Sequence, residues 1–455
     1  MGGAAYIDAL VPSGTHRTRK TIPVTDVSGR PIAHCSQVPP LLAHRVIRDL
    51  RRSEAPGAQR RERALREAGR RFAEDSLAGL SPAEYEHLVS RVCGLPISAV
   101  RSSTAAIAAA AREAAGLVRD AVPAGAVTDA ADIPARSAGA VWVRRGQVLA
   151  INAPGNHPAV HATWLEALAL GYRVAVRPSS REPFTPQRLV AALRASGLRD
   201  DEVVFLPGDR ATADELLREA DLGIVYGGDE MVGRYAHDPT VLVQGPGRSK
   251  VLVGGDAMGA AELIAESVAS EGGTACANAT AVLVEGDPEP LAVEVAKRLA
   301  ALPALPPQEE AARLPVLPLA AARAVESAYH ARVGDGRVLL GRGGIIQELG
   351  DDSAALGPAV ILLESPDDQR LRAELPFPCV WFAPWRPESG VEPLKDSLVV
   401  TALGCSDSVV EQLVGDPSIA GIHVGDRPTN QRSLGAPHDG YLPHFLMRGK
   451  GVIRS

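Results

Sequence analysis

The sequence has few aromatic residues and few cysteines, and it carries no excess of positive charge. Phe, Trp and Tyr make up only 4% of the 455 residues, so composition identifies no pocket for a fatty or an aromatic group. The five cysteines are odd in number, widely scattered and without a CxxC pair, which argues against a disulfide framework and a zinc site. A net charge of −6 argues against a nucleic-acid partner.

Long apolar runs are missing as well. No stretch is long enough to cross a membrane, and the N-terminus lacks the charged segment and apolar run of a signal peptide. We therefore expect a cytoplasmic protein in a reducing environment, where a free thiol persists. Hydrophobic content of 45% and charged content of 22% are typical of a globular protein, and the length predicts two or three domains.

The central third of the chain alternates between short β-branched runs and amphipathic helical patterns. The predicted strands are residues 148–152, 173–176, 203–206, 222–226 and 241–243. This alternation predicts an α/β fold with a parallel, doubly wound, Rossmann-type sheet, which binds dinucleotides at the carboxyl ends of its strands. Residues 138–143 and 147–152 are predicted to pair as a hairpin across a turn at 144–146.

Helical patterns precede this region, and a second α/β region follows it. The early helices are predicted at residues 41–75, 81–94 and 99–121. The pattern restarts near residue 256, so we expect a nucleotide-binding domain over 1–255 and a second, catalytic α/β domain over 256–455. The proline-rich segment 303–318 is predicted to be a surface connection with a short acidic helix.

A cysteine stands in a turn of small residues within the segment 271–280, EGGTACANAT. Gly272, Gly273 and Ala275 place no bulky side chain in front of the backbone at this turn. A reactive cysteine acts as a thiolate in a partly exposed polar setting, whereas a buried one is a small hydrophobe. We interpret Cys276 as the candidate nucleophile.

Three other motifs each follow a predicted strand. They are APGNHP at residues 153–158, RPSS at 177–180 and YGGDEMVG at 226–233. Asn156 in the first motif is either a functional amide or the cap of a helix that starts at Pro158. His157 and His161 have the spacing of metal ligands on a helix, but no third ligand accompanies them, so no metal site is predicted.

The order of these motifs resembles the aldehyde dehydrogenase superfamily over roughly residues 135–430. The resemblance implies an aldehyde-dehydrogenase-like fold in which Cys276 attacks a carbonyl carbon and Asn156 stabilises the oxyanion. It also implies contacts to a dinucleotide cofactor, with Glu374 on a ribose after one residue of slippage in the motif. The implied cofactor residues are Pro154, Arg177, Ser179, Ser180, Arg181, Gly227, Gly228, Gly233 and Glu374.

Two departures from the common family pattern point to one branch. Gln244 opens the segment 244–250, QGPGRSK, where hydrolytic members carry a glutamate, and a neutral amide cannot take a proton from water. The Gly-Pro-x-x-Ser pattern in this segment and the PHDG motif at 437–440 resemble the LuxC-type acyl-CoA reductases. His438 in that motif either belongs to a tight polar turn or lines the pocket and orients the acyl carbonyl.

The resemblance therefore implies NAD(P)H-dependent reduction of an acyl-CoA, or another acyl thioester, to the aldehyde. Ser180 stands where many relatives carry glutamate, and its neighbours Arg177 and Arg181 favour NADPH over NADH. The alternatives are an NAD(P)-dependent aldehyde dehydrogenase, CoA-acylating or hydrolytic, a reductase served by an acid-activating ligase or acyl carrier protein, and an inactive scaffold. A homo-oligomer is implied, with the 138–152 hairpin and the C-terminal tail as contacts.

Overall fold

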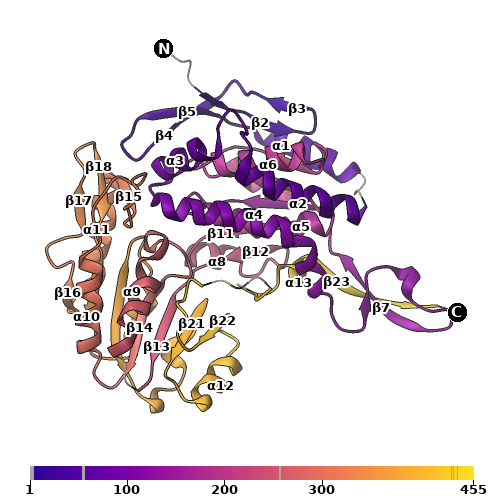
Figure 1. Cartoon of the computed structure of the whole chain (residues 1–455). Helices are drawn as coiled ribbons and strands as arrows, with labels where there is room; N and C mark the ends of the chain where they lie inside the picture. Colours follow the sequence, from indigo (N-terminus) through magenta and orange to yellow (C-terminus); the bar gives the residue numbers. More distant parts are fainter. Residues whose placement is uncertain are drawn as a thin grey trace.

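The computed structural model describes residues 5–53, 57–255, 258–431, 433, 435–437 and 439–454. Two seven-stranded sheets form the cores of two regions, and a small sheet made partly by the C-terminal strand extends from the side (Figure 1). The N-terminal region is drawn in indigo and purple at the top, and the region after residue 258 in orange at the lower left.

The first large sheet is parallel over its first five strands, and its last two strands run antiparallel to their neighbours. Its order is β12 (Val241–Gln244), β11 (Leu222–Tyr226), β8 (Val148–Asn152), β9 (Arg173–Arg177), β10 (Val203–Phe205), β2 (Ala9–Val11) and β3 (Gly14–His16). The parallel, doubly wound sheet expected from the sequence is confirmed.

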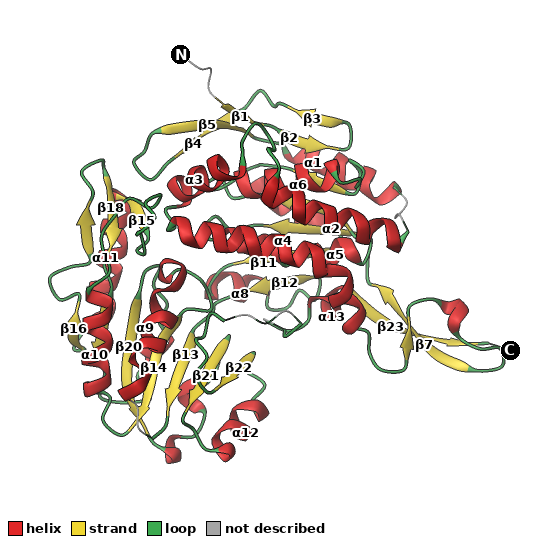
Figure 2. Ribbon diagram, viewed as in Figure 1, coloured by secondary structure: helices red, strands yellow, loops and turns green. Residues whose placement is uncertain are grey.

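Both faces of this sheet are covered by helices, as Figure 2 shows. Val148 and Ala150 of β8 pack with α1 (Pro40–Arg52) and α7 (Arg210–Glu219), whereas Leu149 and Ile151 face the opposite cluster. That cluster contains α2 (Ala58–Glu74), α3 (Pro82–Cys93), α4 (Ile97–Asp120), α5 (Leu165–Ala169) and α6 (Phe184–Ala195). Successive side chains of a strand point to opposite faces, so a continuous apolar run is what two covered faces require.

The second large sheet is parallel apart from its first strand. Its order is β16 (Arg337–Leu340), β19 (Ala359–Leu362), β20 (Cys379–Trp385), β14 (Ala279–Glu285), β13 (Ser249–Val253), β21 (Val399–Leu403) and β22 (Gly421–Val424). Helices α9 (Ala261–Ala269) and α10 (Glu289–Ala300) cover one face, and α11 (Leu319–Val333) packs on the other.

The N-terminal region predicted to be helical contains four helices in its described part, with α1 and α2 in the stretch predicted over 41–75. Ser81 caps α3 in a capping box, because its Oγ accepts from the Glu84 N–H while the Glu84 carboxylate accepts from the Ser81 N–H. Among the described residues, no single helix is long and apolar enough to span a membrane. The bent pair of α3 and α4 passes that test only when the two helices are taken together.

The hairpin predicted over 138–152 is wrong. β7 (Ala138–Arg144) pairs antiparallel with the C-terminal strand β23 (Met447–Ile453) and parallel with β6 (Ala126–Val127). β8 instead lies between β9 and β11 in the first large sheet. Four of its five residues are buried, so the backbone groups on both of its edges need hydrogen-bond partners within the protein. The two strands are adjacent in sequence but belong to different sheets.

The connection over 303–318 also differs from expectation. The predicted acidic helix is wrong, because residues 303–315 form turns and irregular backbone before β15 (Val316–Pro318). Prolines supply no backbone donor and disfavour the helical conformation of the residue before them. This segment carries Pro303, Pro306, Pro307 and Pro315. β15 pairs with β18 (Ser353–Leu356), which also pairs with β17 (Ile346–Glu348).

Candidate active site

The turn that carries Cys276 is held from within by Asn278. We call residues 270–278 the cysteine turn; it follows α9 and leads into β14. The buried Asn278 side chain accepts from the Ala275 N–H at 2.8 Å and donates to the Ser270 and Ser267 carbonyl oxygens at 2.9 and 3.1 Å. Since both ends of the amide have partners, the turn is fixed while the Cys276 side chain remains half-buried.

Two glycines are required around the cysteine turn for space and for conformation. Gly273 has a φ of +66°, and a Cβ there would lie 2.6 Å from the Pro378 backbone nitrogen. Gly247 packs against the turn from outside, and a Cβ there would lie 1.9 Å from the Cys276 carbonyl oxygen. Ser249 donates from Oγ to that same oxygen at 3.0 Å, so the segment after β12 fixes the cysteine backbone.

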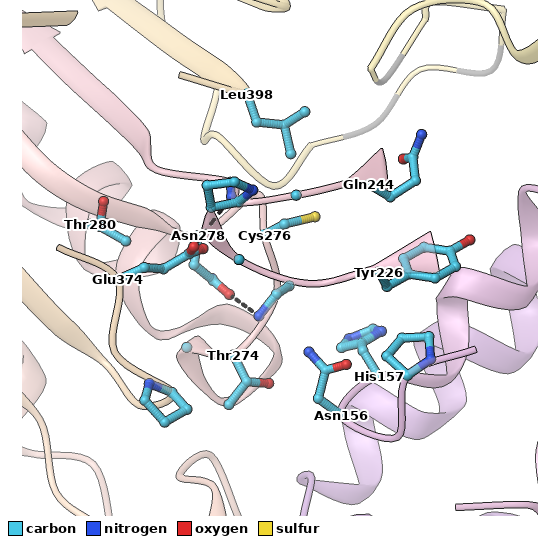
Figure 3. A pocket seen from close by; sticks show the side chains of 18 of the residues that line it. Asn156, His157, Tyr226, Gln244, Thr274, Cys276, Asn278, Thr280, Glu374 and Leu398 are labelled. Atoms are coloured by element: carbon cyan, nitrogen blue, oxygen red, sulfur yellow. Dashed lines mark hydrogen bonds between the residues drawn. The ribbon is translucent and has the colours of Figure 1, made fainter. Parts of the chain in front are cut away.

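A cavity of about 430 Å³ lies in front of the Cys276 thiol. Its walls come from the carboxyl ends of β8, β11 and β12 in the first sheet and from the cysteine turn and the segment before β20 in the second region (Figure 3). The cavity brings together these residues predicted from sequence: Pro154, Asn156, Gly227, Gly228, Gln244, Cys276 and Glu374.

Residues 43–387 match the protein-family model described as the aldehyde dehydrogenase family. The chain belongs to the aldehyde dehydrogenase family. It is therefore an oxidoreductase of the aldehyde dehydrogenase type, with the predicted aldehyde-dehydrogenase-like fold of a Rossmann-type nucleotide-binding region and a second α/β region. A search of curated proteins found no match in sequence.

Solved aldehyde dehydrogenases superpose on nearly the whole chain. A variant of 1-pyrroline-5-carboxylate dehydrogenase from Thermus thermophilus is 17% identical, with 99% of this chain and 93% of that chain covered and a TM-score of 0.83. The aldehyde dehydrogenase KauB from Pseudomonas aeruginosa is 19% identical, with 98% and 96% covered and a TM-score of 0.83. A variant of betaine aldehyde dehydrogenase from Staphylococcus aureus, in complex with NAD+, is 16% identical, with 98% and 95% covered and a TM-score of 0.84. At these identities the likeness establishes the fold.

Within this aldehyde dehydrogenase fold, Asn156 is not the helix cap that the sequence left open. The 3-10 helix 158–162 is capped by His157, whose Nδ1 accepts from the Ala159 N–H at 3.3 Å. Asn156 is exposed and its side chain points into the cavity (Figure 3). Its amide is therefore available to a bound carbonyl oxygen.

Gln244 lies at the end of β12, opposite Tyr226 of β11 in the sheet register. Both side chains line the cavity near Cys276 (Figure 3). A glutamine amide does not ionise, so this position offers hydrogen bonds and no base.

The acidic side chains along the described cavity wall are Glu374 and Asp439. Burial raises the pKa of Glu374, although its Oε2 accepts from the Gly247 N–H at 3.3 Å, which acts in the opposite direction. Desolvation likewise raises the pKa of Asp439. His438 lies outside the described residues, so its role stays a prediction, but its neighbour Asp439 brings the 437–440 segment to the cavity.

The other predicted cofactor residues do not line this cavity. We call residues 177–182 the arginine segment; it follows β9. Arg177 donates to the Gly208 carbonyl oxygen at 2.9 Å and to Asn152 Oδ1 at 3.2 Å, and Arg181 donates to the Cys93 carbonyl oxygen at 2.6 Å.

The remaining predicted cofactor residues are Ser179, Ser180 and Gly233, and the last two are exposed to solvent. Ser179 Oγ accepts from the Arg181 N–H at 3.2 Å, while Ser180 is exposed. Gly233 lies on the exposed helix α8 (Asp229–Tyr235), where a Cβ would meet no described atom within 4 Å. Gly233 is therefore not required there by packing within the chain.

Several cavity residues were not singled out from the sequence. Tyr226 belongs to the motif at 226–233 but was given no role, and Asn278 belongs to the segment 271–280 but was not distinguished from its small neighbours. His157 was considered only as a metal ligand; its Nε2 instead lies 3.2 Å from Glu271 Oε2. His161 accepts from the Trp164 indole N–H, and burial lowers the pKa of His161 to about 3, so it is a neutral core residue.

Metal-type ligands do gather elsewhere among the described residues. His44 Nδ1 lies 3.2 Å from both Glu215 Oε1 and Glu219 Oε2, between α1 and α7. Arg218 pairs with both carboxylates, so part of their charge is already neutralised within the protein. These residues do not line the cavity at Cys276.

Proposed function

We propose that the protein reduces an acyl thioester, most simply an acyl-CoA, to the aldehyde through an acyl-enzyme on Cys276, as in LuxC-type acyl-CoA reductases. The observation that supports the proposal is that Gln244 lines the cavity that also contains Cys276; by the family resemblance this is the position of the base in hydrolytic members, and an amide cannot be that base. Transfer of an acyl group to sulfur and its later reduction need no activated water.

The first chemical step is attack of the Cys276 thiolate on the thioester carbonyl carbon. A new carbon–sulfur bond forms, the bond to the CoA sulfur breaks, and the released CoA thiolate takes a proton. In the tetrahedral intermediate, negative charge develops on the carbonyl oxygen, where the Asn156 amide and the Cys276 backbone N–H are the proposed donors. After reduction of the acyl carbon, the oxyanion collapses, the aldehyde leaves and the Cys276 thiolate returns.

The cavity suits a nicotinamide dinucleotide as the source of reducing equivalents. Gly228 leaves open backbone at the carboxyl end of β11, where a Cβ would meet no described atom within 4 Å, and the cavity continues from there to Cys276. Glu374 would accept from ribose hydroxyl groups, and Pro154 and Gly227 would line the ring site. When bound there, the dinucleotide supplies the hydride.

The preference for NADPH remains a prediction from Ser180, Arg177 and Arg181. Both guanidinium groups donate to protein oxygens, so a 2′-phosphate would have to displace those bonds or bind beside them. NADH is the alternative, and a comparison of kcat/KM for the two cofactors distinguishes them.

The experiment that tests the function is incubation with a panel of acyl-CoA thioesters in the absence of nicotinamide. We expect an acyl adduct on Cys276 by peptide mass analysis, absent from Cys276→Ala and released as aldehyde when NADPH or NADH is added. A folded, nucleotide-binding protein that forms no adduct with any aliphatic or aromatic CoA thioester would contradict the free-CoA substrate. A carrier-protein thioester, or an acid-activating ligase as donor, would then be tested in the same assay.

Family membership supports a second candidate, oxidation of an aldehyde with NAD(P)+, either CoA-acylating or hydrolytic. Acid formation from an aldehyde without CoA would establish the hydrolytic activity and show that Gln244 does not prevent it. We also expect a homo-oligomer, with the largely exposed β23 and its partner β7 as the candidate contact. Light scattering of the full chain and of a Gly451→Pro variant, which weakens β23, tests that expectation.

A further inference from the structure

A histidine that lines the cavity contacts a glutamate of the cysteine turn. His157 follows Asn156 directly, in the loop after β8, while Glu271 belongs to the cysteine turn. Their side chains approach to 3.2 Å between Nε2 and Oε2, with His157 only 6% exposed and Glu271 21% exposed. His157 lines the cavity and is labelled beside Asn156 in Figure 3.

The tautomer of His157 follows from its other nitrogen. Nδ1 accepts from the Ala159 N–H at 3.3 Å, so the proton of the neutral ring must reside on Nε2. Nε2 is buried without a hydrogen bond among the described residues, and the Glu271 carboxylate oxygen lies 3.2 Å from it, near enough to accept its proton after a small rotation. Since Nδ1 accepts from Ala159 and Nε2 carries the ring proton, neither nitrogen is available as a base for the Cys276 thiol.

The backbone at Glu271 adopts a conformation that is unusual for a residue with a side chain. Glu271 has a φ of +53° and a ψ of +30°, a left-handed conformation that disfavours residues with a Cβ. The next two residues, Gly272 and Gly273, also have positive φ, and a third glycine would adopt the conformation at lower cost. A carboxylate kept at such a position points to a function for that carboxylate.

We propose that His157 and Glu271 form a positioning pair, which fixes the Asn156 amide relative to the Cys276 thiol. The inference rests on the proposed roles of those two residues. Asn156 is exposed in a loop of the first region, and Cys276 belongs to a turn of the second region. A misplacement of about 1 Å in a catalytic group can cost about 100-fold in rate, so a direct contact between loop and turn would preserve the placement of the oxyanion donor.

The test compares two reactions of Cys276 that need neither CoA nor nucleotide. p-Nitrophenyl acetate acylates the thiolate through a tetrahedral oxyanion and releases p-nitrophenolate, whereas iodoacetamide alkylates the same thiolate without forming an oxyanion. A pair that positions the oxyanion donor affects only the first reaction. A pair that ionises the thiol affects both.

The first variant is Glu271→Gly, which removes the carboxylate and relieves the left-handed backbone. We expect the acylation rate to fall by about 10- to 100-fold while the alkylation rate changes by less than about 2-fold. The melting temperature should be unchanged or higher, which a merely structural contribution of Glu271 would not give. Equal loss in both reactions, or no loss in either, would overturn the proposal.

The second variant is His157→Asn, which keeps a good helix cap but cannot reach Glu271. It should reproduce the Glu271→Gly result, and the double variant should be no slower than either single one, because the two side chains act as one unit. Multiplicative losses in the double variant would contradict the pair. His44→Asn removes the histidine of a His–Glu contact of the same 3.2 Å length outside the cavity and should leave both reactions unchanged.

Because p-nitrophenyl acetate contains no CoA, its reaction with Cys276 tests this inference separately from the proposed function. A wild-type protein acylated by the ester but by no acyl-CoA would contradict the thioester substrate and leave the positioning pair testable. A wild-type protein that the ester does not acylate would overturn the inference together with the role of Cys276.

Discussion

The cysteine turn and the arginine segment use polar side chains in opposite ways. In the cysteine turn, Asn278 and Ser249 bond to the backbone, so the Cys276 side chain faces a cavity. In the arginine segment, the conspicuous charged groups of Arg177 and Arg181 bond to protein oxygens. A residue type at a family position therefore indicates function only when the fold leaves its polar atoms available to a ligand.

The largest expected effect is in the cysteine turn. Cys276→Ala should lower turnover of acyl-CoA or aldehyde on the order of 10³-fold or more, because Cys379, the other thiol on the described cavity wall, is buried and burial raises its pKa. Stopped-flow measurement of nucleotide oxidation or reduction checks this. Nucleotide affinity by fluorescence titration should stay within about 2-fold. A variant that keeps a tenth of wild-type turnover would place the chemistry elsewhere.

The packing behind the cysteine turn should matter almost as much. Gly247→Ala places a Cβ within 1.9 Å of the Cys276 carbonyl oxygen, so the turn must shift, and we expect a loss of about 10²-fold in acylation. The matched control is Gly116→Ala in α4, where a Cβ meets no described atom within 4 Å. Gly116→Ala should retain full acylation. Comparable losses in the two variants would show that the close approach is unimportant.

The sequence predicted the parts of the fold that depend on local pattern. Buried parallel strands need apolar residues on both faces, so β8, β9 and β11 appear as continuous apolar runs. The apolar pattern led to the wrong strand pairing over residues 138–152, because an apolar run does not show which other strand it pairs with. β7 found its partner in β23, at the far end of the chain.

The candidate site was likewise predicted only in part from the sequence. Asn156 and Gln244 were predicted from motifs at the ends of strands in the first sheet, whereas Cys276 was predicted from a turn of small residues that leads into β14; all three line the same cavity. The partners of the arginines were not readable, since Arg177 bonds a residue 31 positions away and Arg181 one 88 positions away. The His157–Glu271 contact likewise joins distant segments, and only its left-handed backbone, absent from the sequence, marks it as unusual.

The arginine segment should affect stability more than activity. Burial raises the pKa of Glu182 to about 7, and its carboxylate accepts from the Thr185 N–H at 2.8 Å. The native state therefore holds the proton more tightly than the unfolded state. The cost of ionising Glu182 is absent below the unfolded pKa, grows as the pH rises towards 7, and is fully present above it.

Glu182→Gln mimics the neutral acid and keeps the acceptor for Thr185. We expect it to raise the free energy of unfolding by about 1–3 kcal/mol at pH 8 and to change it little near pH 4.5. Urea denaturation at both pH values measures this. Glu411→Gln, at an exposed position of α12 (Asp407–Gly415), is the control without a burial cost. If the Glu182→Gln substitution lowered the free energy of unfolding at pH 8 relative to wild type, more than it does at pH 4.5, the predicted direction of the effect would be wrong.

The smallest effect is expected from Arg181→Ala, which tests whether the arginine segment distinguishes NADPH from NADH. The Arg181 guanidinium donates to the Cys93 carbonyl oxygen at 2.6 Å, so a 2′-phosphate would have to displace that bond or bind beside it through the other N–H groups. We therefore expect the ratio of kcat/KM for NADPH to that for NADH to change by less than about 3-fold, as for Arg63→Ala on the exposed side of α2. A fall of more than about 10-fold confined to NADPH would mean that the Arg181 guanidinium binds the 2′-phosphate. In that case the arginine segment, like the cysteine turn, would present an available polar group, and the distinction between the two regions would disappear on cofactor binding.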